Sequence, residues 1–191
     1  MFTCKSHNTE TLVIKQSKFI AHMMPYRQFD EVLIRLKEEH PKARHFVTAF
    51  RYLNEHEQVV EGSSDDGEPK GTSGKPSLHV LQGNALINSA VIIVRYFGGT
   101  KLGTGGLVRA YGDAVNLVIR ESELIPYEKT SLLACACSYH DFGRVVYVIA
   151  QKQAVLLTKD FGTSEVKLQI KGNLEQIEVI KKELNGVIIL L

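Results

Sequence analysis

Glycine and positive charge are concentrated in one window of the sequence, between Gly62 and Gly112. Eleven of the chain's 15 glycines fall in this window, and no Asp or Glu occurs from Pro69 to Gly112. The cations of the same stretch are Lys70, Lys75, Arg95, Lys101 and Arg109. Glycine costs backbone entropy, so this density indicates tight turns, positive φ angles or the close approach of another group. Backbone amides without side chains over them, close to cations, favour the binding of an anion.

The composition is that of an ordinary globular protein. The chain has 191 residues, a hydrophobic fraction of 44%, a charged fraction of 23% and a formal net charge of +2. This length has room for one large domain or two small ones. No apolar run approaches the ~20 residues needed to span a bilayer, and the N-terminus lacks the apolar stretch of a signal peptide. We therefore expect a cytoplasmic protein with no membrane partner.

The cysteines do not indicate a disulfide framework or a metal site. Cys135 and Cys137 lie two residues apart, which places them on one face of a strand, and Cys4 stands alone near the N-terminus. The chain has no CxxC pair, so neither a zinc knuckle nor a thioredoxin-type site is supported. We expect no resident metal and no cofactor.

The first two thirds of the chain predict a mixture of strands and helices. Strands are predicted within 11–26, 43–53 and 58–62, and the continuous β-branched run 89–97 predicts a buried strand. Helices are predicted over 27–40, over 77–82 and over 105–121, the last with Thr104 as its cap.

After Pro126 the predicted elements become regular. Strands are predicted over 131–139, 154–161, 164–172 and 186–191, and helices over 141–151 and 174–184. Asn173 is the expected cap of the second helix. This β-α-β-β-α-β order is the ferredoxin-like pattern. We therefore predict an α+β protein of two domains, residues 1–127 and 128–191.

Two nucleotide-binding motifs are suggested by the glycine window and then excluded by their spacing. Pro69 stands where a P-loop requires its first glycine, and Pro76 replaces the Ser or Thr that would hold magnesium. In GTGGLV, Val108 occupies the third glycine position of the dinucleotide fingerprint. Neither motif is therefore present.

The acidic residues just before the window allow two interpretations. Asp65, Asp66 and Glu68 could form an acidic lip that supplies oxygens to a hard cation such as Mg²⁺. The alternative, which we favour, is an acidic turn whose side chains bond to nearby backbone amides. The secondary candidates for a chemical role are His45, Thr72 and Ser73; no nucleophile elbow accompanies the two hydroxyls, and structural roles are favoured for all three.

The clearest candidate binding site lies between the strand that ends at Arg95 and Tyr96 and the helix that begins near Gly105. Helix N-termini present unpaired amides and partial positive charge, which favour an anion. Lys101 lies in the connecting loop, and Arg109 lies about one turn into the helix. The glycines that would supply amide donors are Gly98, Gly99, Gly103, Gly105 and Gly106. We therefore predict an anion-binding site here.

The long motifs of the window resemble the signature of the Impact/YigZ family. These are SDDGEPKGTSGKP (64–76) and RYFGGTKLGTGGLVRAYGDA (95–114), and SKFIAH (17–22) and ARHFVTAFR (43–51) resemble other landmarks of the family. The resemblance extends over essentially the whole chain and is to the bacterial form, which lacks the RWD domain of eukaryotic members.

The resemblance implies a fold for each domain and a role connected with translation. The first domain is expected to be similar to the second domain of ribosomal protein S5. The second is expected to be ferredoxin-like and similar to the last domain of elongation factor G. Both relatives work on ribosomes and RNA, and eukaryotic family members regulate translation initiation under stress. Such analogy is associational evidence for function.

These observations lead to one leading hypothesis and two alternatives. We expect a non-catalytic protein that binds RNA or a ribosomal surface and regulates translation. Its cations would contact phosphates, and Tyr96 would stack on a base. The first alternative is a metal-dependent enzyme acting on a phosphorylated small molecule or nucleotide, with the acidic lip holding the metal. The second is a protein-interaction module, whose partner could be a translation-related protein.

Overall fold

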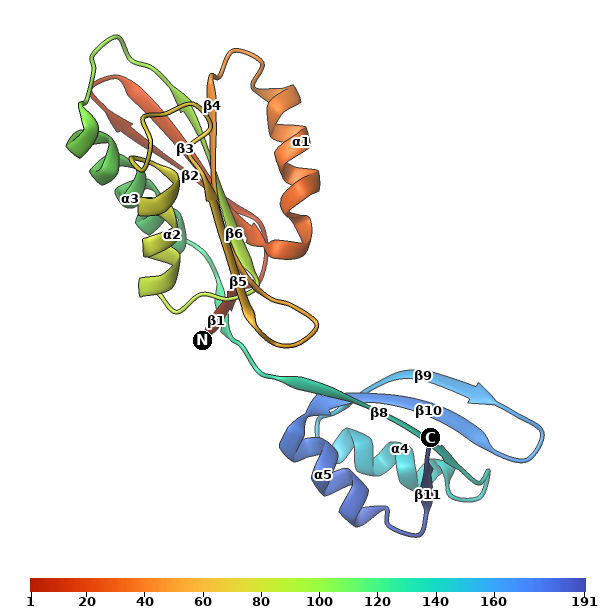
Figure 1. Ribbon diagram of the computed structural model, residues 1–191. Coiled ribbons are helices and arrows are strands. Elements are labelled where there is room, and N and C mark those ends of the chain that lie inside the picture. The colour runs from red at the N-terminus through yellow and green to blue at the C-terminus, as the bar shows by residue number, and fades with distance from the viewer. The chain divides into compact units, whose positions relative to one another are not determined.

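The computed structural model describes all residues, 1–191, as a mixed α+β protein, as predicted. The chain divides into two compact units, residues 1–127 and 128–191 (Figure 1). No helix is long and apolar enough to cross a membrane.

The first unit contains seven strands, three α-helices and one 3-10 helix. In chain order they are β1 (Phe2–Cys4), β2 (Asn8–Ile14), β3 (Ser17–Pro25), η1 (Tyr26–Gln28), α1 (Phe29–Glu39), β4 (His45–Leu53), β5 (Val59–Ser64), α2 (Gly74–Gly83), β6 (Ser89–Tyr96), α3 (Thr104–Arg120) and β7 (Leu124–Pro126). The helix predicted over 77–82 is longer than expected and begins at Gly74.

A five-stranded sheet is the centre of the first unit. Its strand order is β2-β3-β6-β4-β5, and every neighbouring pair is antiparallel. Helix α1 lies on one face of the sheet, and α2 and α3 lie on the other (Figure 1). Strands β1 and β7 form a separate two-stranded sheet.

The central strand β6 is buried on both faces because helices cover both. Ile92 and Val94 pack toward α1, whereas Val91 and Ile93 pack toward α2 and α3. A strand covered on both sides has no solvent-facing positions, so its sequence becomes continuously apolar instead of alternating. The prediction of a buried strand over 89–97 is confirmed.

The second unit has six elements in the predicted order. They are β8 (Thr130–Cys137), α4 (Phe142–Gln151), β9 (Val155–Phe161), β10 (Val166–Asn173), α5 (Leu174–Glu183) and β11 (Ile188–Leu190). The strands form one antiparallel sheet in the order β11-β8-β10-β9. Asn173 caps α5 as predicted: its side chain accepts from the Gln176 amide, and the Gln176 side chain accepts from the Asn173 amide.

Both cysteines of β8 lie in the core of the second unit. Cys135 and Cys137 are unpaired and pack with residues of α4 and α5, including Val145 and Ile180. Burial, together with the neighbouring Cys137 thiol, raises the pKa of Cys135 to about 11. These thiols therefore act as small apolar groups.

The layered core of the first unit predicts that replacing two different isoleucines with Ala will cost very different amounts of stability. Ile93 is fully buried in β6, whereas Ile34 on α1 is 62% exposed. Replacing Ile93 with Ala should lower the free energy of unfolding by about 2–5 kcal/mol, because the sheet and helices cannot close the cavity. The matched control, Ile34→Ala, should change it by no more than about 0.5 kcal/mol. Urea denaturation followed by circular dichroism measures both, and equal losses would contradict this account of the core.

Candidate functional site

Three connecting segments meet at one end of the five-stranded sheet. Strand pairing puts His45, at the start of β4, opposite Arg95 near the end of β6. The segments 40–44, 65–73 and 97–103 therefore lie at the same end of the unit (Figure 1). They bring the acidic residues, the glycine loop and the start of α3 into one region.

Asp65 organises the segment that leads into α2. Its carboxylate accepts hydrogen bonds from the backbone amides of Gly71, Ser73 and Gly74 at 2.7–3.1 Å, and from the Ser73 hydroxyl at 2.7 Å. Burial by itself would raise the pKa of Asp65, but these hydrogen bonds outweigh it and hold the pKa below its ordinary value. The carboxylate thus stabilises the turn and the helix N-terminus.

The other two carboxylates of the predicted acidic lip have different partners. Asp66 has a positive φ of 46°, and its carboxylate accepts from the Phe46 amide at 2.6 Å. Glu68 turns inward and is buried. No group of three His, Cys, Asp or Glu residues is arranged to hold a metal ion. Asp65 and Asp66 thus accept from backbone amides, as the carboxylates of an acidic turn do.

A buried ion pair joins the acidic segment to the sheet and to α3. The Arg95 guanidinium donates to Glu68 Oε1, and the side chains are 7% and 3% exposed. The Tyr111 hydroxyl donates to the same oxygen at 2.9 Å. Burial, followed by the charge and hydrogen bond of Glu68, raises the pKa of Tyr111, so this phenol stays protonated. Arg95, one of the cations predicted to contact phosphates, is therefore already paired with Glu68 within the chain.

Arg95 also makes aromatic contacts. Its Cζ lies 5.3 Å from the ring centre of Phe19 and 5.8 Å from that of Phe97. Its Nε is buried without a hydrogen-bond partner. Two cavities are lined by this side chain. Arg95 is thus a positive group, held by Glu68, in the wall of both.

Several glycines of the window are required by the local backbone. A Cβ on Gly98 would lie 2.0 Å from the backbone of Gln16, and one on Gly74 would lie 2.8 Å from the backbone of Ser64. Gly99 and Gly103 have positive φ angles of 86° and 73°. Gly105 differs, because a Cβ there would meet nothing within 4 Å. Close packing therefore accounts for Gly98 and Gly74, and positive φ angles account for Gly99 and Gly103, but neither accounts for Gly105.

The N-terminus of α3 is left without a cap. Its N-cap residue is Gly103, so the prediction that Thr104 caps this helix is wrong, and no side chain bonds to the first amides. The Leu107 amide bonds back to the Gly103 carbonyl, but no acceptor within the chain meets the amides of Thr104, Gly105 and Gly106. No acidic residue lies in the first turn. Partial positive charge is therefore exposed here.

A cavity of about 350 Å³ opens beside this helix start. Among the predicted residues, Lys101, Gly103, Glu68 and Arg95 line it. The other predicted cations lie outside its wall but are exposed and make no ion pair: Lys70, Lys75 and Arg109. The predicted anion site thus has the loop and the start of the helix in one cavity wall, with Lys101 as the exposed cation that lines it.

Tyr96, predicted to stack on a base, is half-buried and bonded within the chain. It points to the α1 face of β6, where its hydroxyl lies 2.9 Å from His40 Nδ1. The next residue, Phe97, is 57% exposed and lines both cavities. The exposed aromatic of this region is therefore Phe97, which the sequence analysis missed.

The second cavity adds two further cations that the sequence analysis missed. It has a volume of about 410 Å³ and is lined by Lys42 and Arg44 together with His45. Both cations are exposed and precede β4 in the chain. Their signal in the sequence was proximity to His45, but only the pairing of β4 with β6 brings them beside the glycine loop.

The three secondary candidates have structural partners. His45 Nδ1 donates to the Asp66 carbonyl at 2.8 Å, and its Nε2 lies 3.9 Å from Glu68 Oε1. The Thr72 hydroxyl donates to the Pro69 carbonyl, and the Ser73 hydroxyl donates to Asp65. Both residues are buried in the turn before α2.

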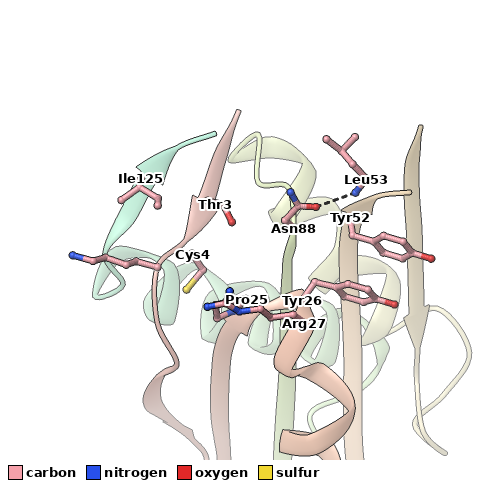
Figure 2. Close-up of a pocket in the computed structure, with 10 residues that line it drawn as sticks. Thr3, Cys4, Pro25, Tyr26, Arg27, Tyr52, Leu53, Asn88 and Ile125 are labelled. Atoms are coloured by element: carbon pink, nitrogen blue, oxygen red, sulfur yellow. Dashed lines mark hydrogen bonds between the residues drawn. The ribbon is translucent and has the colours of Figure 1, made fainter. Parts of the chain in front are cut away.

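Another cavity, of about 430 Å³, lies at the opposite end of the sheet (Figure 2). Tyr26 and Tyr52 stack at its edge with ring centres 4.1 Å apart. Asn88 accepts from the Leu53 amide, and Lys5, also in the wall, pairs with Glu123. None of the predicted site residues lines this cavity. Its polar groups are largely satisfied within the chain.

Residues 15–119 match the family model of the Impact N-terminal domain. The chain belongs to the Impact family. The resemblance seen in the sequence motifs is therefore confirmed. The matched stretch contains all of the residues that form the glycine window.

Impact-family relatives match this chain over most of its length. An Impact family member of Haemophilus influenzae is 37% identical over 176 residues, which cover 90% of this chain and 84% of that protein. The member YigZ of Escherichia coli is 37% identical over 153 residues, covering 78% and 74%. A crystal structure of a hypothetical protein has a TM-score of 0.71 at 29% identity, covering 100% of this chain and 95% of that chain.

The hydrogen bonds of Asp65 predict a pH-dependent contribution to stability. Asp65→Ala should lower the free energy of unfolding by about 0.5–2 kcal/mol, as for other lost helix caps. The folded-state pKa lies below the ordinary value of 3.8, so the unfolded chain binds more protons between the two values. The contribution should be fully present above pH 3.8 and should fall as the pH drops through the folded pKa.

Urea denaturation at several pH values measures this effect. The control is Asp113→Ala, which removes an exposed carboxylate from α3. It should leave stability unchanged or slightly higher, because Ala favours a helix. A loss for Asp65→Ala that stayed constant through the acid range would contradict the ionised carboxylate as its cause.

The buried pair predicts a larger loss when one partner is removed. Glu68→Gln should destabilise the protein by about 3–5 kcal/mol, because it leaves the Arg95 guanidinium buried without a counter-charge. Adding Arg95→Met should recover much of the loss, since no buried charge remains. Thermal and urea denaturation of the single and double variants test this. A double variant less stable than Glu68→Gln would show that Arg95 stabilises the fold without its partner.

Proposed function

We propose that this Impact-family protein binds RNA or a ribosomal surface and regulates translation, without catalysing a reaction. The observation that carries the proposal is the end of the sheet where the uncapped start of α3 lies among exposed cations. Unbonded amides and cations are the donors that proteins use for phosphate oxygens. Eukaryotic members of the Impact family regulate translation initiation. Membership of this family therefore supports a role in translation.

The fold supports this proposal by analogy. We propose that residues 1–127 form a domain similar to the second domain of ribosomal protein S5. We propose that residues 128–191 form a ferredoxin-like domain similar to the last domain of elongation factor G. The order β11-β8-β10-β9 with two helices on one sheet is consistent with the second assignment. A cytoplasmic location fits a protein that acts on ribosomes.

Four exposed cations would make the phosphate contacts: Lys70, Lys75, Lys101 and Arg109. Their side chains are not neutralised by ion pairs within the chain, so they would attract a polyanion without first breaking an internal contact. The enzyme alternative has less support, because the acidic residues serve the turn, the Phe46 amide and the buried pair. Arg95 would contribute to this surface through its fixed position and not as a free phosphate ligand.

The test is a double charge reversal at the glycine loop. Lys101→Glu with Arg109→Glu should abolish retention of RNA in a filter-binding assay, because each reversal replaces phosphate attraction with repulsion. The melting temperature should change little, since both side chains are exposed.

A matched control makes the same change in net charge elsewhere. Arg27→Glu with Arg120→Glu alters two exposed cations away from the glycine loop, in η1 and in the last turn of α3. This variant should retain RNA nearly as well as the unaltered protein. Equal retention by the two double variants would exclude the glycine loop as the binding site.

A further inference from the structure

Phe97 is more exposed than the other aromatic side chains near Arg95. Tyr96 is half-buried and bonded to His40, and Phe19 is fully buried under α3, but Phe97 is 57% exposed. It lies at the junction of the two cavities, and its ring lies 5.8 Å from the guanidinium carbon of Arg95. Arg95 is in turn fixed by Glu68. The ring is thus backed by an immobile cation.

Each of the two cavities that Phe97 lines is also lined by at least one exposed cation. Lys42 and Arg44 line the cavity of about 410 Å³, and Lys101 lines the cavity of about 350 Å³. None of the three makes an ion pair, and the nearest buried carboxylate, Glu68, is already neutralised. Phe97 is therefore shared by a cavity lined by Lys42 and Arg44 and a cavity lined by Lys101, and the second cavity also reaches the uncapped start of α3.

This combination matches the chemistry of a nucleic-acid strand passing across the end of the sheet. Phosphates are bound by cations and amides, and a base between them is bound by an aromatic face. A purely apolar partner would satisfy Phe97 but would leave the surrounding cations unpaired. Charge complementarity therefore favours a polyanion over a protein segment.

The exposed ring also distinguishes single strands from duplexes. In an A-form duplex each base is already stacked on its neighbours, so none can offer a free face to a protein ring. An unpaired base can stack on an exposed aromatic, largely independent of its identity. A stacking platform among cations therefore selects single-stranded regions without selecting a sequence.

We propose that Phe97 is a base-stacking platform and that the ligand of this surface is single-stranded RNA. Lys42 and Arg44 would contact the backbone on one side of the stacked base, and Lys101 would contact it on the other. This inference rests on the proposed function, since it names the class of RNA bound at the same site.

The test compares a labelled single-stranded RNA of mixed sequence with the duplex that it forms with its complement, by fluorescence anisotropy. Phe97→Ala should weaken single-strand binding by roughly 5- to 150-fold, the loss of one stacked base. Phe97→Trp should retain the affinity, because it keeps an aromatic face. The unaltered protein should bind the duplex more weakly, and Phe97→Ala should not weaken duplex binding further.

Two readouts separate stacking from charge and from folding. Phe97→Ala should keep the slope of affinity against salt concentration, because the phosphate contacts remain, whereas Lys101→Glu should reduce it. The control Tyr147→Ala removes an aromatic that is 62% exposed on α4, and it should bind as the unaltered protein does. The melting temperature of Phe97→Ala should also be unchanged.

The outcomes distinguish this inference from the proposed function. If RNA binds and Lys101→Glu weakens it, but Phe97→Ala has no effect, the stacking platform is wrong and the RNA-binding surface stands. Equal affinity for single strand and duplex would likewise overturn the inference alone. If the unaltered protein binds neither RNA, both the proposed function and the inference fail.

Discussion

The buried Glu68–Arg95 pair is the interaction on which the site depends. It connects the segment before α2 to the end of β6, and the Tyr111 hydroxyl extends it to α3. Burying two charges costs desolvation free energy that their attraction only partly offsets, so such a pair is weak evidence for stability as such. The pair matters here because of the positions that it fixes. The pair fixes three separate parts of the chain at the end of the sheet where the glycine loop begins.

The glycine loop is shaped by a second set of constraints, which act on the backbone. Gly98 passes against the backbone of Gln16, and Gly103 takes a positive φ at the position where α3 starts. A residue with a side chain at Gly98 would separate β6 from the turn between β2 and β3. The close approach holds the loop, and the loop presents the free amides of α3. Gly105 has no such role in the fold, since a Cβ there would meet nothing within 4 Å.

Local signals in the sequence were sufficient for most of the fold. The β-branched run of β6 and the Asn173 cap of α5 depend on residues close in the chain, and both were predicted. The site was predicted less well, because its contacts join distant residues. Alternation along β6 places Arg95 and Tyr96 on opposite faces, but only packing decides which face is covered by α3 and which by α1. Glu68 lies 27 residues before Arg95, and no local pattern indicates that pairing.

Neutralisation of Arg95 changes what kind of ligand the surface can favour. A compact phosphate would be bound best by charges that converge on one point, and Arg95 would be the natural centre of such a group. With Glu68 on that guanidinium, the remaining positive groups are dispersed around the end of the sheet, at Lys42, Lys101 and the start of α3. Dispersed charges gain most from a ligand whose own charges are spread along a chain, because each contact then neutralises a separate phosphate. The buried pair therefore favours an extended polyanion over a small one.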